Sequence, residues 1–199
     1  MRHFSFYTLI LLLLSGCSTS SPSINEYTLF TPQAPTSQKI PLFSKTLTVA
    51  SVKAIPSLCG KNLIYLRENG ETGSYLYSRW SDTPATLMQR SLMQSFNENT
   101  LFVSISPASS LAQSDWVLES DLNSFYHRFT KDASEGYIDM TYRLIDVHTK
   151  VSIASKRFVI TAPAHSMDAL GGIEALKHAQ NELNHQSIEW LKTLTKDTK

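Results

Sequence analysis

The sequence is poor in several features that mark common functional classes. It has 2 cysteines and 7 glycines, and it contains no Gly-rich phosphate loop, no nucleophile elbow and no paired-cysteine metal motif. Its 18 Lys and Arg balance 17 Asp and Glu, so the basic excess of a nucleic-acid-binding protein is missing. The apolar run from Phe4 to Leu14 is shorter than the ~20 residues that a membrane-spanning helix needs. Nucleic-acid binding and a permanent transmembrane span are therefore disfavoured.

The composition nevertheless favours a folded chain. At 199 residues, with 42% hydrophobic and 10% aromatic residues, the sequence suffices for one domain with a hydrophobic core.

The Ser, His and Asp residues of a hydrolase triad are all present, but none lies in a recognisable strand-turn-helix context. We therefore expect a non-enzymatic protein that uses no noncovalent cofactor.

Residues 1–16 have the order of a secretory signal peptide: a basic start at Arg2, an apolar run and small residues. The sequence Leu14-Ser15-Gly16-Cys17 resembles the lipobox of bacterial lipoproteins. This resemblance implies that the Cys17 thiol carries a diacylglyceryl group with acyl chains such as palmitate, and that Cys17 begins the mature protein. The alternative is an ordinary signal peptide with a chance cysteine. Ser18, where retained inner-membrane lipoproteins of enteric bacteria carry Asp, implies an outer-membrane location facing the periplasm.

The mature chain would be neutral and would keep one further cysteine. Loss of residues 1–16 removes only Arg2, which leaves 18 − 1 = 17 basic residues against 17 acidic residues. A lipid-anchored protein of this kind does not need a polybasic patch to stay at a membrane. Cys59 is expected to be buried beside Leu58, with an intermolecular disulfide or a reactive thiol as alternatives.

The chain after Cys17 divides into a tether and a domain. Residues 17–25 are predicted to be a lipidated tether, and residues 26–199 a single domain. Short strands are expected at residues 26–30, 47–52 and 101–105. The Asn69-Gly70 pair between residues 63–66 and 74–77 predicts a β-hairpin.

Two helices and a three-strand meander complete the prediction. Thr83-Pro84 opens an amphipathic helix of about four turns, and Ser166 is expected to cap a final helix that runs to about Thr195. Residues 116–126 and 137–147 alternate with a period of two, and short turns join them to each other and to a third strand at residues 151–161, which is typical of an antiparallel meander. The predicted fold class is α+β: an antiparallel sheet with two main helices packed on one face.

The remaining candidate metal-binding and ligand-binding residues also have simpler structural explanations. His178, Glu182 and His185 share one face of the last helix with the spacing of a zinc site, but such a pattern arises easily by chance on a polar helix face. We therefore expect no metal. The side chains of Trp80, Trp116 and Trp190 are expected in the core, with a ligand groove or an oligomer interface as alternatives.

The order of short motifs resembles the ABC-type transport auxiliary lipoprotein family, whose members include the paraquat-inducible protein C lipoproteins. The matching pieces are Tyr27-Thr28-Leu29, Val52 to Pro56 with Leu58, Leu63 to Arg67, Tyr77 to Trp80, Pro84, Leu118 to Phe125 and Asp168-Ala169-Leu170. The resemblance implies a lipid-anchored, non-enzymatic component of an ABC transporter system. It would act with an MCE-domain periplasmic protein in lipid transport between the inner and outer membranes. It also implies a fold similar to the N-terminal domain of TolB and a ring-like homo-oligomer.

Arg79 and Trp80 are the pair that we predict to bind a protein partner, because Trp and Arg are favoured at interfaces. The alternative is that Trp80 packs beneath a helix and Arg79 pairs with an acid or caps carbonyls. Two other functions also remain open at this point: a passive structural envelope lipoprotein and a lipid-carrying module, each without a transporter partner.

Overall fold

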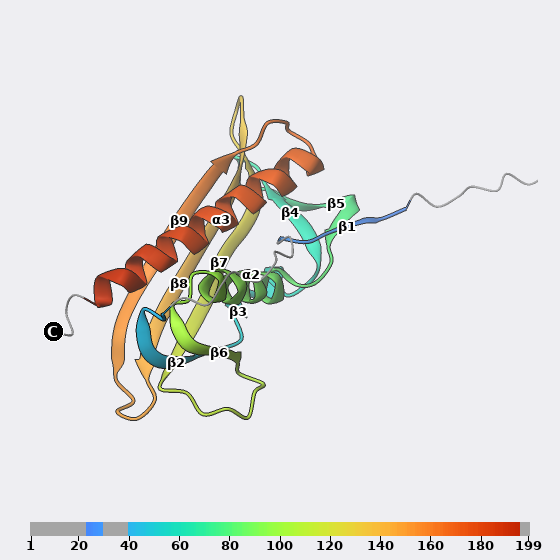
Figure 1. Cartoon of the computed structure of the whole chain (residues 1–199). Helices are drawn as coiled ribbons and strands as arrows, with labels where there is room; N and C mark the ends of the chain where they lie inside the picture. Colours follow the sequence, from blue (N-terminus) through green and yellow to red (C-terminus); the bar gives the residue numbers. More distant parts are fainter. Residues whose placement is uncertain (1–22, 30–39, 196–199) are drawn as a thin grey trace, which may run out of the picture.

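The computed structural model describes residues 23–29 and 40–195 (Figure 1). The predicted signal peptide, Cys17 and Phe30 lie outside these residues. The described strands form one nine-stranded sheet with two α-helices. This arrangement confirms the predicted α+β class.

The sheet is organised around β7 (Trp116–Phe129), a strand of 14 residues that has neighbours along both edges. One edge pairs in antiparallel fashion with β8 (Ser134–Asp146), which in turn pairs with β9 (Ser152–Pro163). This is the predicted meander. The other edge of β7 is shared by three shorter strands, all parallel to it: β2 (Phe43–Val49), β3 (Lys53–Ala54) and β4 (Asn62–Leu66).

The remaining strands extend the sheet beyond this group. β6 (Phe102–Pro107) lies parallel to β2, β5 (Thr72–Trp80) lies antiparallel to β4, and β1 (Asn25–Tyr27) lies parallel to β5. The sheet is therefore mixed, and the prediction that it is antiparallel was wrong for this half. Local turn signals reveal only pairs of consecutive strands, whereas the parallel pairs join strands that are distant in sequence.

The hairpin between β4 and β5 is confirmed. Gly70 has φ 84°, a left-handed conformation that glycine adopts without steric cost, and its amide donates to the carbonyl of Arg67 at 2.9 Å. The side chain of Asn69 accepts from the amide of Glu71 at 3.0 Å. The 3-10 turn η1 (Pro56–Leu58) connects β3 to this hairpin.

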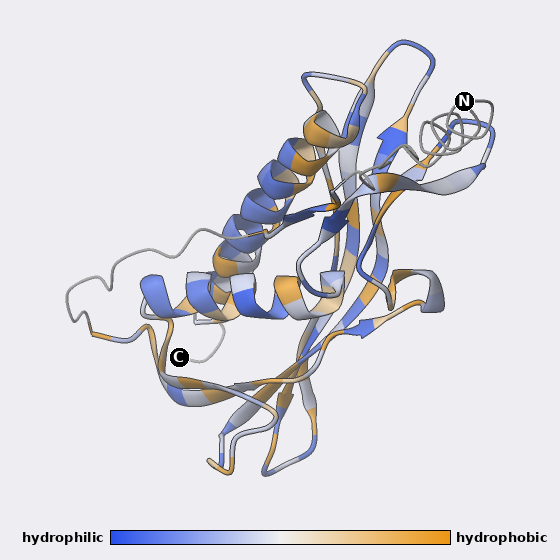
Figure 2. Ribbon diagram, turned by 90° about the vertical axis from the view of Figure 1, so that its right-hand side faces the viewer, coloured by the Kyte–Doolittle hydropathy of each residue, from blue (hydrophilic) through white to orange (hydrophobic). Residues whose placement is uncertain are grey.

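Both helices lie on the same side of the sheet, as predicted (Figure 2). α2 (Pro84–Glu98) begins after Thr83, whose side chain accepts from the amide of Thr86. α3 (Ala169–Leu194) is capped by Asp168, two residues later than the predicted Ser166. The Asp168 carboxylate accepts from the amide of Gly171 at 2.9 Å, and the Ser166 hydroxyl donates to that carboxylate at 2.8 Å. Asn184 of α3 donates to the Ser91 hydroxyl of α2 at 2.9 Å and so ties the helices together.

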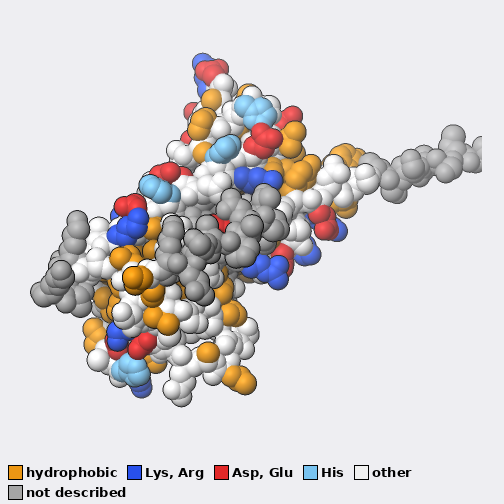
Figure 3. All heavy atoms as spheres, in the orientation of Figure 1, with side chains coloured by type: hydrophobic (Ala, Val, Ile, Leu, Met, Phe, Trp, Pro, Cys, Tyr) orange, Lys and Arg blue, Asp and Glu red, His pale blue; other side chains and the backbone are white. Residues whose placement is uncertain are grey.

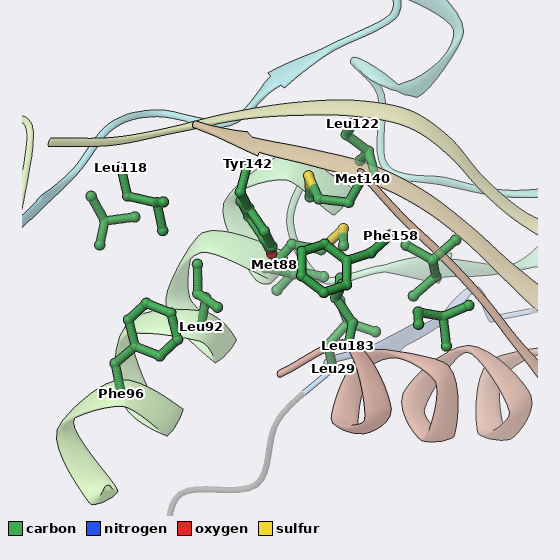
Figure 4. Packing of buried hydrophobic residues seen from close by; sticks show 14 of the residues in the cluster. Leu29, Met88, Leu92, Phe96, Leu118, Leu122, Met140, Tyr142, Phe158 and Leu183 are labelled. Atoms are coloured by element: carbon green, nitrogen blue, oxygen red, sulfur yellow. The ribbon is translucent and has the colours of Figure 1, made fainter. Parts of the chain in front are cut away.

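The core fills the space between the sheet and the two helices. Figure 4 shows side chains from β7, β8 and β9 meeting side chains from α2 and α3. The buried residues that it labels are Leu29, Met88, Leu92, Phe96, Leu118, Leu122, Met140, Tyr142, Phe158 and Leu183. Each helix buries one face in this layer, which is the arrangement that its apolar spacing predicts.

A bulge in β7 decides which of its side chains face the helices. Leu122 pairs with Met140, but Ser124 pairs with Asp139, so Asn123 is an extra residue in β7. Before the bulge the even-numbered residues Leu118 and Leu122 are buried. After it the odd-numbered Phe125 and His127 are buried instead, because the extra residue reverses the alternation. The uninterrupted period of two read over residues 116–126 was therefore wrong beyond Leu122.

Candidate functional site

The predicted pair Arg79 and Trp80 lies at the end of β5, where β1, β4 and the start of α2 meet. β1 runs beside this end of β5, with Glu26 opposite Arg79 and Tyr27 opposite Trp80. The next residue, Ser81, donates its amide to the Tyr27 carbonyl at 2.7 Å and accepts from Lys61 Nζ at 2.7 Å. The pair therefore lies where the N-terminal strand joins the rest of the domain.

Arg79 is exposed and already bound to an acid. Its Nε and Nη2 both donate to Oε1 of Glu26, at 2.9 and 2.6 Å. This ion pair crosses from β5 to β1, so it holds the two strands in register. An exposed pair of this kind contributes little to stability, ~0–1 kcal/mol, because solvent competes for both charges. The guanidinium lies at the surface, where a protein partner can reach it.

Trp80 occupies a different environment from its neighbour. Its side chain is 1% exposed and packs on Phe125, with 5.4 Å between the ring centroids. Its Nε1 atom has no hydrogen-bond partner among the described residues. In this conformation the indole contributes to the core and presents no surface to a partner, so its geometry favours the packing alternative.

The other two tryptophans pack against aromatic rings. Trp190 of α3 is buried and contacts Phe158 at 6.0 Å between centroids. Trp116 is half-buried, with its ring 5.3 Å from that of Phe43 and 6.1 Å from that of Phe102. The expectation that the tryptophans belong to the core is confirmed for Trp80 and Trp190, whereas Trp116 is partly buried and packs against the core.

A buried histidine that the sequence analysis did not single out lies beneath the start of α3. His127 is 0% exposed, and its Nδ1 lies 2.7 Å from the hydroxyl of Tyr75, while Nε2 has no partner among the described residues. Burial lowers the pKa of the imidazole from 6.5 to about 4 and raises the pKa of Tyr75 from 10.0 to about 12. Both groups are therefore neutral at pH 7.

Gly172 of α3 makes room for this histidine. A Cβ atom at position 172 would lie 2.4 Å from Nδ1 of His127, which is closer than nonbonded atoms approach. The sequence signal for His127 was hidden by the bulge at Asn123, because the regular alternation assigns position 127 to the outer face. His127 and Tyr75 lie in a cluster of aromatic rings with Phe129 and Tyr65. Neither side chain lines any of the described hollows.

The face of the sheet opposite the helices carries ion pairs. Arg143 of β8 reaches Asp121 at 2.5 Å and Glu119 at 3.5 Å, both on β7. Arg157 of β9 donates to both carboxylate oxygens of Asp139, at 2.9 and 2.6 Å, and lowers the pKa of that carboxyl. These pairs are cross-strand neighbours that satisfy one another, so they explain a polar face without requiring a ligand.

Two of the hollows on the described surface near these strands have equal volumes. One, of about 280 Å³, is lined by side chains of β3, β7 and β8, including Lys53, Asp121 and Arg143. The other, also about 280 Å³, lies over β4, β5 and β7 and includes Ile64 and Tyr126. Both are slightly smaller than the ~300–1,000 Å³ of typical small-molecule sites.

The spaced residues of the last helix do not converge on a site. His178, Glu182 and His185 are all exposed, and Glu182 accepts from Gln186 at 2.7 Å. Among residues 23–29 and 40–195, no group of three His, Cys, Asp or Glu side chains is placed to hold a metal ion. In the same residues no helix is both long and apolar enough to cross a membrane.

Cys59 was expected to be buried, and this expectation was wrong. The cysteine is exposed and follows the η1 turn, with its Sγ 3.6 Å from the carbonyl oxygen of Ile55. Its neighbour Leu58 fills the core position instead, because consecutive residues of the turn point in different directions. The other cysteine, Cys17, lies outside the described residues.

Comparison with known proteins identifies relatives at the level of family and of fold. Residues 27–186 match the family model described as the ABC-type transport auxiliary lipoprotein component. No curated protein matches the chain. The family match runs from Tyr27, the last residue of β1, through most of α3, so it covers nearly all of the described domain.

Solved structures share the fold at low sequence identity. Protein XCC0632 from Xanthomonas campestris is 16% identical with a TM-score of 0.73, covering 88% of this chain and 95% of its own. A second, uncharacterised protein is 14% identical with a TM-score of 0.63, covering 85% and 99%. A hypothetical protein from Chlamydia trachomatis is 9% identical with a TM-score of 0.53, covering 75% and 96%. These likenesses concern the fold alone.

Proposed function

The chain belongs to the family of ABC-type transport auxiliary lipoprotein components, and on this premise we propose that it is a lipid-anchored, non-enzymatic subunit of a lipid-transport system. The system comprises an ABC transporter and an MCE-domain periplasmic protein and moves lipids between the inner and outer membranes. The observation that carries the proposal is the family match over residues 27–186. The lipobox-like sequence before Cys17 supports the same role independently.

The proposed anchor is a diacylglyceryl and acyl modification of Cys17, which holds the protein at the periplasmic face of the outer membrane. Two or more acyl chains anchor stably where one does not. Eight residues, Ser18 to Asn25, separate the anchor from Glu26, the first residue of the predicted domain. A flexible chain of that length spans about 16 Å, since its reach grows as 5–6 Å times the square root of residue number. The domain therefore works close to its membrane.

In the proposed mechanism the protein docks onto a transport protein and catalyses no reaction. On the uncovered sheet face Arg143 pairs with Glu119 and Asp121, and Arg157 pairs with Asp139. The two hollows, of about 280 Å³ each, are slightly smaller than typical small-molecule sites. These features suit a scaffold that positions a transport protein better than a module that carries a lipid in its interior. We further propose that several copies assemble into a ring around the MCE-domain protein.

Copurification tests the proposal. The full chain is expressed in its native host, extracted in mild detergent and analysed by mass spectrometry, with a Cys17→Ser variant as the control for anchoring. We expect an MCE-domain protein or an ABC transporter subunit with the wild type. Abundant lipid without either protein would contradict the proposal in favour of a lipid carrier, and neither lipid nor protein would favour a passive structural lipoprotein.

A further inference from the structure

β5 contains a sharp bend that exposes apolar side chains. Asn62 of β4 pairs with Arg79, but Ile64 pairs with Ser74, so the single residue between them faces the four residues 75–78 of β5. The extra residues arch out of the sheet at its edge, where Figure 1 shows β5 turning beside β1. Within the arch Leu76 is 78% exposed and Tyr77 is 52% exposed.

A third apolar side chain lies next to the arch. Asn25 of β1 is in register with Ser78, so the preceding residue, Ile24, runs alongside Tyr77 in this parallel pair. Ile24 is 48% exposed. Hydrophobic side chains gather on this side of the molecule, near the point where the described chain begins (Figure 3). We call Ile24, Leu76 and Tyr77 the β5 arch surface.

The arch surface lies close to the proposed anchor along the chain. Cys17 precedes Ile24 by seven residues, which span at most ~25 Å when fully extended and about 15 Å as a flexible coil. Because Ile24 belongs to the arch surface itself, any bilayer that holds the acyl chains of Cys17 lies within reach of this edge. The β6 edge lies at the other end of the strand order, β1-β5-β4-β7-β2-β6.

We propose that the β5 arch surface rests in the headgroup region of the membrane that holds the lipid anchor. This inference rests on the proposed lipidation of Cys17. Leu76 and Ile24 supply aliphatic side chains, while Tyr77 supplies an amphipathic ring of the kind enriched at membrane interfaces. The ion pair of Arg79 and Glu26 lies next to the arch and stays among the polar headgroups.

The size of the surface favours a membrane over a second protein chain. A stable protein interface buries ~800 Å² on each partner, far more than three partly exposed side chains present. A tethered surface needs only weak intrinsic affinity, because the anchor keeps it at a high effective concentration beside the bilayer. The contact would fix the orientation of the domain on its membrane and thereby the direction from which a transport protein docks.

Depth-dependent fluorescence quenching tests the contact in the full lipidated chain. In a Cys59→Ser background, an environment-sensitive fluorophore is attached to Leu76→Cys, and in the matched control to Val103→Cys, a 60% exposed site on the β6 edge. Both proteins are reconstituted into vesicles of phosphatidylethanolamine and phosphatidylglycerol with nitroxide-labelled lipid. We expect several-fold stronger quenching and a blue-shifted emission at position 76. Position 103 should be unaffected.

The outcomes separate this inference from the function on which it rests. Equal quenching at both positions in a protein that floats with the vesicles would overturn the membrane contact and leave the anchor intact. A blue shift at position 76 without quenching would identify a second copy of the chain as the occupant and would also overturn the membrane contact. Failure of the full chain to float with the vesicles would contradict the proposed lipid anchor, and therefore both the membrane contact and the proposed function.

Discussion

At the scale of single residues, His127 couples the stability of the fold to pH. Its imidazole is neutral in the folded protein until about pH 4, whereas in the unfolded chain it binds a proton below about pH 6.5. Between these values the unfolded state holds more protons, so the free energy of unfolding falls as the pH falls. Asp115, Asp139 and Asp168 have pKa values lowered from 3.8, so their contributions are lost mainly at lower pH.

We predict that proton binding by His127 in the unfolded chain lowers the free energy of unfolding by about 2 kcal/mol between pH 7 and pH 5. The pKa difference between the two states, 6.5 − 4 = 2.5, corresponds to 1.36 kcal/mol per unit, and part of this total effect is reached at pH 5. Urea unfolding at the two pH values measures this loss. The His127→Gln variant should lose much less over the same interval, and His178→Gln, an exposed histidine, should behave as the wild type. An unchanged pH dependence in His127→Gln would contradict the assignment.

Arg79 and Trp80 are adjacent residues with different expected effects. Trp80→Ala removes a large side chain that is 1% exposed and should lower the free energy of unfolding by about 3–5 kcal/mol. Arg79→Gln breaks an exposed ion pair and should cost less than about 1 kcal/mol. Chemical denaturation of both variants checks the contrast.

The contrast decides which variant can test partner binding. Because Arg79→Gln should remain folded, its loss of an MCE-domain protein in copurification would assign a partner-binding role to Arg79. Unchanged copurification would limit Arg79 to its pairing with Glu26. A Trp80→Ala protein that is as stable as the wild type would show that the indole is not part of the core.

At the scale of elements, the start of α3 depends on one carboxylate. Asp168→Ala should destabilise the protein by about 0.5–2 kcal/mol, because the amide of Gly171 loses its acceptor at the N-terminus of the helix. Ser166→Ala should cost less, since the Ser166 hydroxyl bonds the capping side chain and not the helix itself. Thermal melts of the two variants compare these effects, and a larger loss for Ser166→Ala would be inconsistent with Asp168 as the cap.

Most of the elements that the sequence predicted correctly are specified by signals within a few neighbouring residues. Asn69-Gly70 predicts the hairpin because its turn needs a left-handed glycine, and Thr83-Pro84 predicts the start of α2 through a cap and a fixed φ. The bulge at Asn123 and the arch of β5 have no such signal. They arise from how strands fit against distant neighbours, so the burial of His127 and the exposure of Leu76 were missed.

At the scale of the whole molecule, resistance to local unfolding should be highest in β7 and β8. Each of these long strands is hydrogen-bonded on both edges and packs beneath α3, whereas β1 has three residues paired only with β5. Native-state hydrogen exchange should therefore be slowest for amides of β7 and β8 and much faster for β1. Exchange in β1 as slow as in β8 would show that β1 opens only with the global unfolding of the domain.

By itself the sequence determined the α+β class, the two helices, the hairpin, the meander and the resemblance to a family of transport auxiliary lipoproteins. These features follow from turn residues, caps and periodicity, which act over a few neighbouring residues. Only the tertiary structure decided that β2, β3 and β4 lie parallel to β7, and that Trp80 is buried while Arg79 pairs with Glu26. Those outcomes depend on contacts between segments far apart in the chain, where local propensity carries no information about which strand becomes the neighbour of which.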